Sequence, residues 1–147
     1  MKNYKNILFA TDFSESNEVI AKRAKEVAEH YGAQLHLIHV LQYHPALFTG
    51  ALFATSASAS PEKILLEQSK EHLEAWAKNL GLDSKYAHTE NGSPKHIIKK
   101  FAQDHDIDLI IIGAHSHEGL DILLGSTANS ILQSAPCDVL VLKNKED

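Results

Sequence analysis

The chain has 147 residues, of which 44% are hydrophobic and 22% are charged, and its formal net charge is -5. This length predicts one domain over residues 1–147, and the acidic balance excludes nucleic acid and anionic membrane surfaces as expected partners. The single cysteine, Cys137, excludes an internal disulfide, and no apolar run approaches the roughly 20 residues of a membrane helix. Because residues 1–6 are polar and do not resemble a secretory signal, we expect a cytoplasmic protein.

Short apolar runs alternate with amphipathic patterns along the chain, which is typical of a parallel sheet with crossover helices. The first strand is predicted over residues 7–10. Ser14 is placed to cap the next helix, whose apolar residues recur at helical spacing and which ends at Gly32.

The second strand is predicted over residues 35–41. It contains His36 and His39, which are three positions apart and are therefore expected on opposite faces of the strand. The connection that follows, residues 42–60, is longer than most in compact domains and too apolar for a simple linker. Its large apolar side chains are Leu47, Phe48, Leu52 and Phe53. We expect part of this segment to pack on the body of the protein or on a partner chain.

Two Ser-Pro pairs mark the starts of the second and third helices. Ser60-Pro61 and Ser93-Pro94 each combine a capping residue with a proline that fits the first helical turn. The second helix is predicted to end at Gly81. Residues 85–89 contain few apolar side chains and predict a weak strand at the edge of the sheet.

The C-terminal third contains the clearest strand, residues 109–112, whose unbroken apolar run fits a central parallel strand covered on both faces. A last helix is predicted over residues 126–134 and a fifth strand over residues 138–142. The chain is therefore expected to form a single-domain α/β fold. It is a doubly wound five-stranded parallel sheet in the order 3-2-1-4-5, with helices on both faces.

In such a sheet, ligands bind beyond the carboxyl ends of the strands where the strand order reverses. Strands one and four are neighbours in this order, so Asp12 is expected to face Gly113 across a crevice. Asp12 would accept a hydrogen bond from a base amino group or a ribose hydroxyl, while amides after Gly113 and the Ser126 hydroxyl would bind phosphate oxygens. Each residue also has a purely structural interpretation: Asp12 in a turn, Gly113 for strand-end geometry, Ser126 as a helix cap.

The charges in the loop predicted after residues 109–112 limit which ligands it would bind. Residues 113–129 contain no Lys or Arg but include Glu118 and Asp121. A triphosphate would therefore depend on amides, the helix dipole, His115, His117 and a metal ion such as Mg²⁺. No P-loop, GxGxxG, HExxH or G-x-S-x-G pattern occurs, so the sequence predicts neither catalytic nor metal-ligating residues.

Several segments spread along the chain share the pattern of one known family. They are Ile7 to Ser14, Leu37 to Val40, Gly92-Ser93-Pro94, Asp108 to Gly113 running into Gly125-Ser126, and Ala135 to Val141. On these segments the chain resembles the universal stress protein family over nearly its whole length. The resemblance implies a cytoplasmic α/β protein that is usually a homodimer, is induced under stress and lacks well-defined catalysis. An enzyme that hydrolyses ATP on this fold is the weaker alternative.

The ATP-binding branch of that family carries Gly, two residues, Gly, nine residues, and then Gly followed by Ser or Thr. Gly113 matches the first position and Gly125-Ser126 the last, whereas Ser116 replaces the second Gly and only eight residues separate it from Gly125. The resemblance implies ATP or a related nucleotide between strands one and four. The candidate binding residues are Ala10, Thr11, Asp12, Val40, Ile112, Gly113, His115, Ser116, Gly125, Ser126 and Thr127.

A second branch of the family provides the alternative function. The segment containing Phe48-Thr49-Gly50 resembles the A-type branch, which is generally regarded as not binding ATP, and would make the chain a dimeric interaction protein with an unknown protein partner. For either function, Val139 to Leu142 is apolar on both faces and would lie at a sheet edge. Such an edge predicts a homodimer in which this strand pairs antiparallel with its copy.

Overall fold

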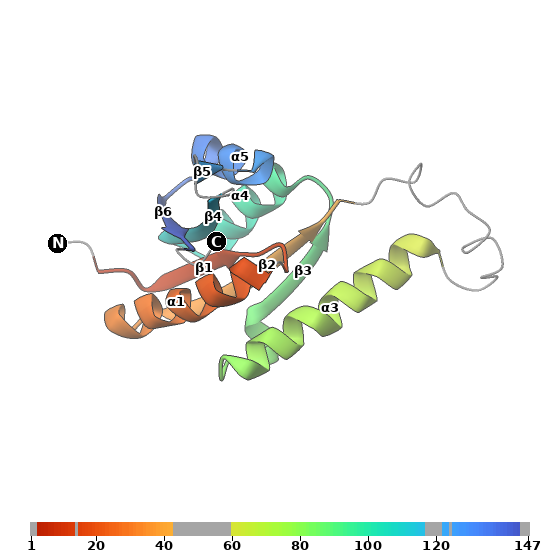
Figure 1. Ribbon diagram of the computed structural model, residues 1–147, viewed down its shortest axis with the longest axis horizontal. Coiled ribbons are helices and arrows are strands. Elements are labelled where there is room, and N and C mark those ends of the chain that lie inside the picture. Colours follow the sequence, from red (N-terminus) through yellow and green to blue (C-terminus); the bar gives the residue numbers. More distant parts are fainter. Residues whose placement is uncertain (1–2, 14, 43–59, 117–121, 124, 145–147) are drawn as a thin grey trace.

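A computed structural model of the chain describes residues 3–13, 15–42, 60–116, 122–123 and 125–144 (Figure 1). Within these residues, parallel strands lie side by side in the order β3-β2-β1-β4-β6. They are β1 (Asn6–Ala10), β2 (Gln34–Leu41), β3 (Ala87–Asn91), β4 (Leu109–Ser116) and β6 (Asp138–Lys143). Because β6 is the fifth predicted strand, the predicted order 3-2-1-4-5 is confirmed. The expected Ser14 cap and the expected packing of Leu47, Phe48, Leu52 and Phe53 fall outside the described residues.

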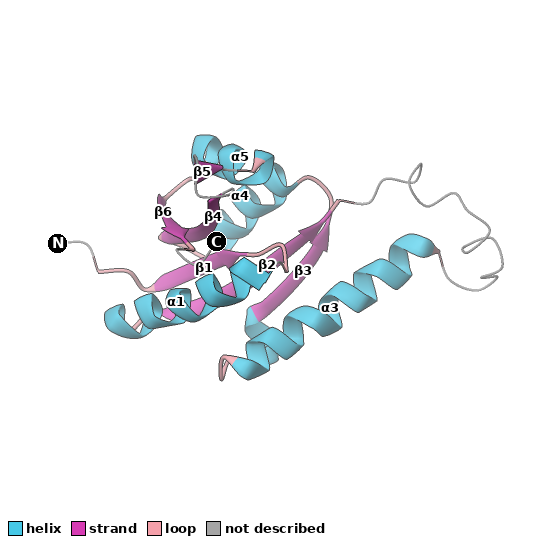
Figure 2. Cartoon of the chain, in the orientation of Figure 1, coloured by secondary structure: helices cyan, strands magenta, loops and turns pink. Residues whose placement is uncertain are grey.

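Helices cover both faces of this sheet (Figure 2). One face packs against α1 (Glu15–Tyr31) and α3 (Pro61–Asn79), and the other against α4 (Pro94–Asp104) and α5 (Ser126–Ser134). No helix in the described part of the chain is both long and apolar enough to cross a membrane.

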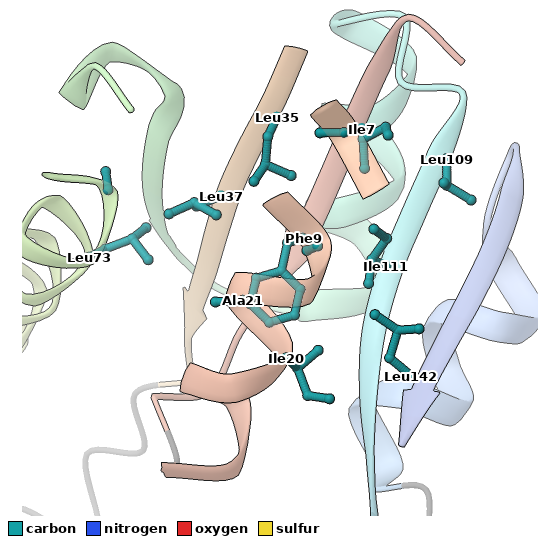
Figure 3. Close-up of a cluster of buried hydrophobic side chains, with 13 residues drawn as sticks. Ile7, Phe9, Ile20, Ala21, Leu35, Leu37, Leu73, Leu109, Ile111 and Leu142 are labelled. Carbon is teal, nitrogen blue, oxygen red and sulfur yellow. The ribbon is translucent and has the colours of Figure 1, made fainter. Parts of the chain in front are cut away.

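Alternation along β1 supplies both halves of the core, since successive strand residues point to opposite faces. Ile7 and Phe9 are fully buried against α1 and α3, and Leu8 is fully buried against α4 and α5. The first cluster, drawn in Figure 3, includes Ile7, Phe9, Ile20, Ala21, Leu35, Leu37, Leu73, Leu109, Ile111 and Leu142. β1 is buried on both faces and lies between β2 and β4, so its carboxyl end is flanked by the carboxyl ends of these two parallel strands.

Polar side chains align the amino ends of three strands. The carboxylate of Asp108 accepts hydrogen bonds from the amides of Lys5 and Asn6 at 2.9 and 3.2 Å, which ties the start of β1 to the start of β4. The Tyr4 hydroxyl donates to Asp138 at 2.7 Å, which adds β6. These contacts explain why a carboxylate, that of Asp108, directly precedes β4. They also help to align the strands, so that the carboxyl ends of the strands lie at the same level.

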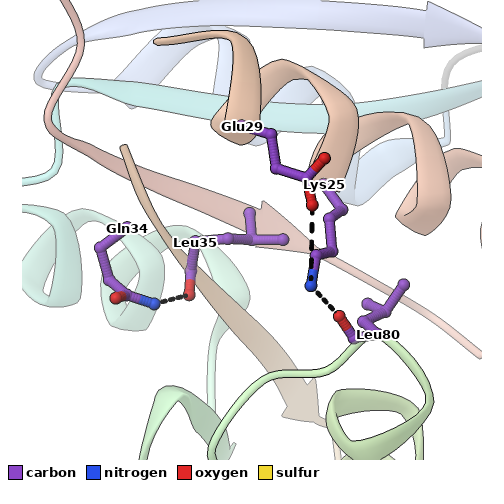
Figure 4. Close-up of polar contacts among 5 residues, drawn as sticks. All are labelled: Lys25, Glu29, Gln34, Leu35 and Leu80. Atoms are coloured by element: carbon purple, nitrogen blue, oxygen red, sulfur yellow. Dashed lines mark hydrogen bonds and ion pairs between the residues drawn. The ribbon is translucent and has the colours of Figure 1, made fainter. Parts of the chain in front are cut away.

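Lys25 fastens α1 to the end of α3. Its Nζ donates to the carbonyl oxygen of Leu80 and lies 3.9 Å from Oε1 of Glu29 (Figure 4). Gly81 follows with a φ of +74°, a left-handed conformation that glycine adopts without strain. The predicted end of this helix at Gly81 is therefore confirmed.

The third strand begins two residues later than predicted. The Asp83 side chain accepts a hydrogen bond from the amide of Lys85 at 3.0 Å, and residues 84–86 form a 3₁₀ turn instead of a strand. The prediction over residues 85–89 overlooked this capped turn, because aspartate binding its neighbour's amide competes with strand formation.

The two Ser-Pro pairs behave differently at their helix starts. Oγ of Ser60 accepts from the amide of Lys63 at 3.2 Å, so the predicted cap of α3 is confirmed. Ser93 occupies the cap position of α4, but its side chain makes no capping hydrogen bond. The prediction of a helix start at Ser93 is confirmed, whereas the expected hydroxyl cap is wrong.

Candidate functional site

A pocket of about 280 Å³ opens at the carboxyl ends of β1, β2 and β4. It lies where β1 is flanked by β2 on one side and β4 on the other, the point at which the strand order reverses. Its described lining consists of Ala10, Thr11, Asp12, Asn17, Ile38, His39, Val40, Gln42, Pro94, Ile98, Ile112, Gly113, Gly125, Thr127, Ala128 and Ile131. The crevice between strands one and four therefore exists, and residues from both ends of the chain form it.

Asp12 stands at the mouth of this pocket directly after β1. Thr11 is buried and fixes the turn: its amide donates to the carbonyl of Ile38 at 3.0 Å, and its hydroxyl accepts from the amide of Phe13 at 3.2 Å. The exposed carboxylate of Asp12 accepts from Nδ2 of Asn17 in the first turn of α1. The Asp12 side chain is thus held in place by α1 while it remains accessible to a ligand.

At Gly113, side chains of α1 approach the backbone of β4 closely. A Cβ atom at this position would stand 2.5 Å from Oδ1 of Asn17 and 3.3 Å from Cγ1 of Ile20. Gly113 has no positive φ, so the requirement for glycine comes from this close approach and not from backbone conformation. Asn17 consequently contacts both motif residues, Asp12 and Gly113.

The α5 side of the pocket is built from the start of that helix. Gly125 occupies the cap position, with φ -63° and ψ 167°, so the cap residue itself has no side chain to offer the helix. Ser126 is the first helical residue, so the interpretation of Ser126 as the cap is wrong. The first amides of a helix have no partner within it and carry the positive end of the helix dipole, which makes this start suited to an anion.

The segment between Gly113 and Gly125 is more regular than predicted. It was expected to be a loop, but β4 continues to Ser116, and β5 (Ile122–Leu123) pairs antiparallel with its end. His115 lies opposite Leu123 in this hairpin. The backbone of His115 and Ser116 therefore belongs to a strand, while their side chains and that of Ser126 lie outside the described part of the structure.

Phe13 and His39 make aromatic contacts next to the turn that contains Asp12. The sequence did not predict these contacts. Phe13 adopts a left-handed φ of 66° and stacks on His72 of α3, with ring centroids 4.3 Å apart. It also contacts His39 at 4.2 Å and Trp76 at 5.6 Å. Nδ1 of His39 donates to the carbonyl of Thr11 at 2.9 Å, which joins this cluster to the pocket lining.

The described lining carries one carboxylate and one imidazole but no Lys or Arg. Burial lowers the pKa of His39, so this imidazole is neutral at pH 7. Apolar side chains supply most of the remaining wall. Electrostatic attraction for an anion at this pocket therefore comes from backbone amides and from the α5 dipole.

Eight of the sequence-predicted site residues line this one pocket: Ala10, Thr11, Asp12, Val40, Ile112, Gly113, Gly125 and Thr127. Asn17, Phe13 and His39 were missed. His36 and His39 do lie on opposite faces as predicted, since His36 packs near Phe101 of α4 and His39 near Phe13. The missed residues act through contacts between elements, for which a single sequence offers no periodic signal.

The fold and the pocket define an α/β protein with a crevice at the reversal point of a doubly wound sheet. The model described as the Universal stress protein family matches residues 3–143, and the chain belongs to this family. Universal stress protein A homolog 1 of Coxiella burnetii is 37% identical over 144 residues, which cover 98% of this chain and 99% of the relative.

Solved structures share this architecture over nearly the whole chain. Universal stress protein UspA from Lactobacillus plantarum is 27% identical, with a TM-score of 0.62 over 97% of this chain and 99% of that one. The universal stress protein from Archaeoglobus fulgidus in complex with dAMP is 21% identical, with a TM-score of 0.60 over 95% and 98% of the two chains. The second likeness shows the common fold.

Proposed function

We propose that this chain is a cytoplasmic stress-response protein that binds ATP or a related nucleotide between the ends of β1 and β4. The observation that carries the proposal is that Asp12 and Gly113, about a hundred positions apart in sequence, line the same pocket. The side chain of Asn17 contacts both of them. A protein of the same fold holds dAMP, which supports a nucleotide as the class of ligand.

In this proposal the two ends of the pocket bind different parts of the nucleotide. Asp12 accepts a hydrogen bond from a ribose hydroxyl or a base amino group, and Val40 and Ile112 give the base an apolar surface. Backbone amides after Gly113 and at the start of α5 bind phosphate oxygens. The remaining proposed contacts come from Ala10, Thr11, His115, Ser116, Gly125, Ser126 and Thr127.

Charge balance shapes the proposed mode of phosphate binding. Since the described lining offers no Lys or Arg, a triphosphate would enter as its Mg²⁺ complex, in which the metal offsets part of the negative charge. The proposed role is binding, and we assign no catalytic residue. A nucleotide that shifts the population of one dimer conformation would change the choice of protein partner.

Calorimetric titration with Mg-ATP tests the proposed site. We expect saturable binding, and we expect Asp12→Ala to weaken it by about 10- to 100-fold, the loss of one hydrogen bond to a charged group. Glu67→Ala is the matched control, because it removes an exposed carboxylate on α3 that does not line the pocket. Absence of saturation at millimolar nucleotide, or unchanged affinity of the Asp12→Ala variant, would contradict the proposal.

The alternative is a dimeric interaction protein of the A type that uses no nucleotide. It is favoured by Ser116 in place of the second motif glycine and by the lack of Lys and Arg among the described residues of the pocket lining. The same titration distinguishes the two, because this alternative requires that the purified protein neither carries a bound nucleotide nor takes one up.

Homodimerisation through β6 is a separate part of the proposal. In the described sheet β6 pairs with β4 alone, and its apolar residues Val139, Leu140 and Leu142 border a groove of about 510 Å³ that Tyr4 and Tyr31 also line. An edge strand of this composition pairs readily with a copy of itself about a two-fold axis.

Sedimentation analysis checks this assembly. We expect a dimer at micromolar concentration and a shift to monomer in Val141→Asp, because a charge buried between two copies would lack a partner. Val19→Asp on α1, where Val19 is 37% exposed, controls for the added charge. A monomeric parent protein, or a folded Val141→Asp variant that still dimerises, would refute assembly through β6.

A further inference from the structure

Three imidazoles from different elements gather beneath α4, on the face of the sheet opposite to α1. They are His36 of β2, His88 of β3 and His105 at the end of α4. Their ring centroids lie 5.7 Å apart for His36 and His88, 5.7 Å for His88 and His105, and 6.1 Å for His36 and His105. We call these three residues the histidine cluster.

Phe101 of α4 is the common contact of the histidine cluster. Its ring stacks on His105 at 3.9 Å, lies against His88 at 4.5 Å, and approaches His36 edge-on at 5.9 Å. His36 is only 8% exposed, and Phe101 is equally buried. The cluster therefore forms part of the packing that holds α4 on β2 and β3.

The contact between His36 and His88 depends on their protonation state. Nδ1 of His36 lies 3.5 Å from Nε2 of His88, so one nitrogen must carry a hydrogen and the other must accept it. A doubly protonated imidazole has no acceptor nitrogen. If one ring is protonated, the neutral partner still supplies the acceptor nitrogen. When both are protonated, two N–H groups and two like charges face each other, and His36 on its buried side is screened from water.

One titratable neighbour is Tyr86 of the 3₁₀ turn, whose ring lies 5.2 Å from that of His36. The other charged residues close to the cluster in sequence are Lys85, Glu90, Lys100, Asp104 and Asp106. Lys100 pairs with Asp104, and Nδ1 of His105 donates to the carbonyl of Phe101 at 3.1 Å. None of the salt bridges among the described residues joins a carboxylate to these imidazoles.

The same helix forms one wall of the candidate nucleotide pocket. Pro94 and Ile98 of α4 line that pocket, and Ile98 lies one turn before Phe101. Movement of α4 away from β2 would therefore widen the pocket.

We propose that the histidine cluster is a proton-sensitive latch: when neutral it holds α4 on the sheet, and on acidification it releases α4 and weakens nucleotide binding. The second half of this inference rests on the proposed function.

The direction of the pH effect follows from burial. Burial and the neighbouring imidazoles lower the pKa of His88 to about 4, and burial lowers that of His36. In the unfolded chain a histidine titrates near pH 6.5, so the unfolded state binds more protons below that pH. The latch therefore stabilises the protein fully above about pH 6.5, and this stabilisation is lost as the pH falls toward 4.

Among the described residues no group of three His, Cys, Asp or Glu side chains is arranged to hold a metal ion, which favours proton binding as the function of the cluster.

Hydrogen exchange of the full-length protein between pH 7 and 5, corrected for intrinsic exchange rates, tests the latch. We expect protection of α4 amides to fall at least 10-fold over this range, while protection in α1 changes far less. His88→Gln is expected to abolish this selective pH dependence. His96→Gln, an exposed histidine of the same helix, is expected to retain it. If His88→Gln does not fold, His105→Gln serves the same purpose.

Nucleotide affinity measured on the same samples separates the two halves of the inference. We expect Mg-ATP affinity to fall several-fold more between pH 7 and 5 in the parent protein than in His88→Gln, a comparison that cancels the titration of the phosphate itself. Equal pH dependence of α4 protection in both proteins would overturn the latch. If no nucleotide binds at any pH, the proposed function fails, while the exchange data still decide whether the latch exists.

Discussion

Replacing Gly113 by alanine is expected to lower the free energy of unfolding by about 2–3 kcal/mol. The new Cβ would stand 2.5 Å from Oδ1 of Asn17, a side chain that is 5% exposed and bound to Asp12. Glycine-to-alanine changes at unhindered positions usually stabilise a protein by up to about 1 kcal/mol, so the sign itself is diagnostic. Because Asn17 must move, we also expect Asp12 to lose its fixed position and nucleotide affinity to fall. Urea denaturation followed by circular dichroism measures the first effect.

Gly125→Ala is the matched control for this substitution, because both glycines belong to the same motif. Among the described residues, no atom lies within 4 Å of a Cβ built on Gly125, and its φ of -63° suits any residue. We expect a loss below about 1 kcal/mol, since alanine is only a poorer cap than glycine at a helix start. Equal destabilisation by the two substitutions would show that contact with Asn17 does not explain the glycine at position 113.

Much of the architecture followed from local patterns in the sequence. The unbroken apolar run at residues 109–112 predicted the buried centre of the sheet, and Ser60-Pro61 predicted a helix start that the Ser60 hydroxyl does cap. Once the strand order was predicted, the general rule for parallel sheets brought Asp12 and Gly113 to one pocket. These predictions succeeded because each depends on residues near one another in sequence or on a rule of topology.

The features that were missed depend on contacts between distant elements. Gly113 and Gly125 have equal weight in the motif, but only the packing of α1 on β4 makes an added Cβ costly at Gly113. The β5 hairpin was missed because residues 113–125 read as a polar glycine-bounded loop, and pairing of His115 with Leu123 overrides that local preference. Likewise, the rings that approach His36 come from the 3₁₀ turn, β3 and α4.

The backbone of Phe13 is strained, and the packing of its side chain offsets the energetic cost. Its φ of 66° is costly for a residue with a Cβ, by roughly 1–2 kcal/mol. The ring compensates by stacking on His72 at 4.3 Å and by contacting His39 at 4.2 Å and Trp76 at 5.6 Å. This conformation turns the chain sharply between Asp12 and α1, so the aromatic contacts stabilise the position of the candidate ligand-binding carboxylate.

Phe13→Ala is therefore expected to lower the free energy of unfolding by about 2–3 kcal/mol, somewhat less than the cost for a fully buried phenylalanine. Phe13→Gly loses the same ring contacts but removes the strain, so we expect it to be about 1 kcal/mol more stable than Phe13→Ala. This order reverses the usual ranking of alanine above glycine. Urea denaturation of the three proteins measures both differences, and a Phe13→Ala variant at least as stable as Phe13→Gly would contradict a strained backbone at Phe13. Nucleotide affinity should fall in both variants, because each removes the aromatic support that positions Asp12.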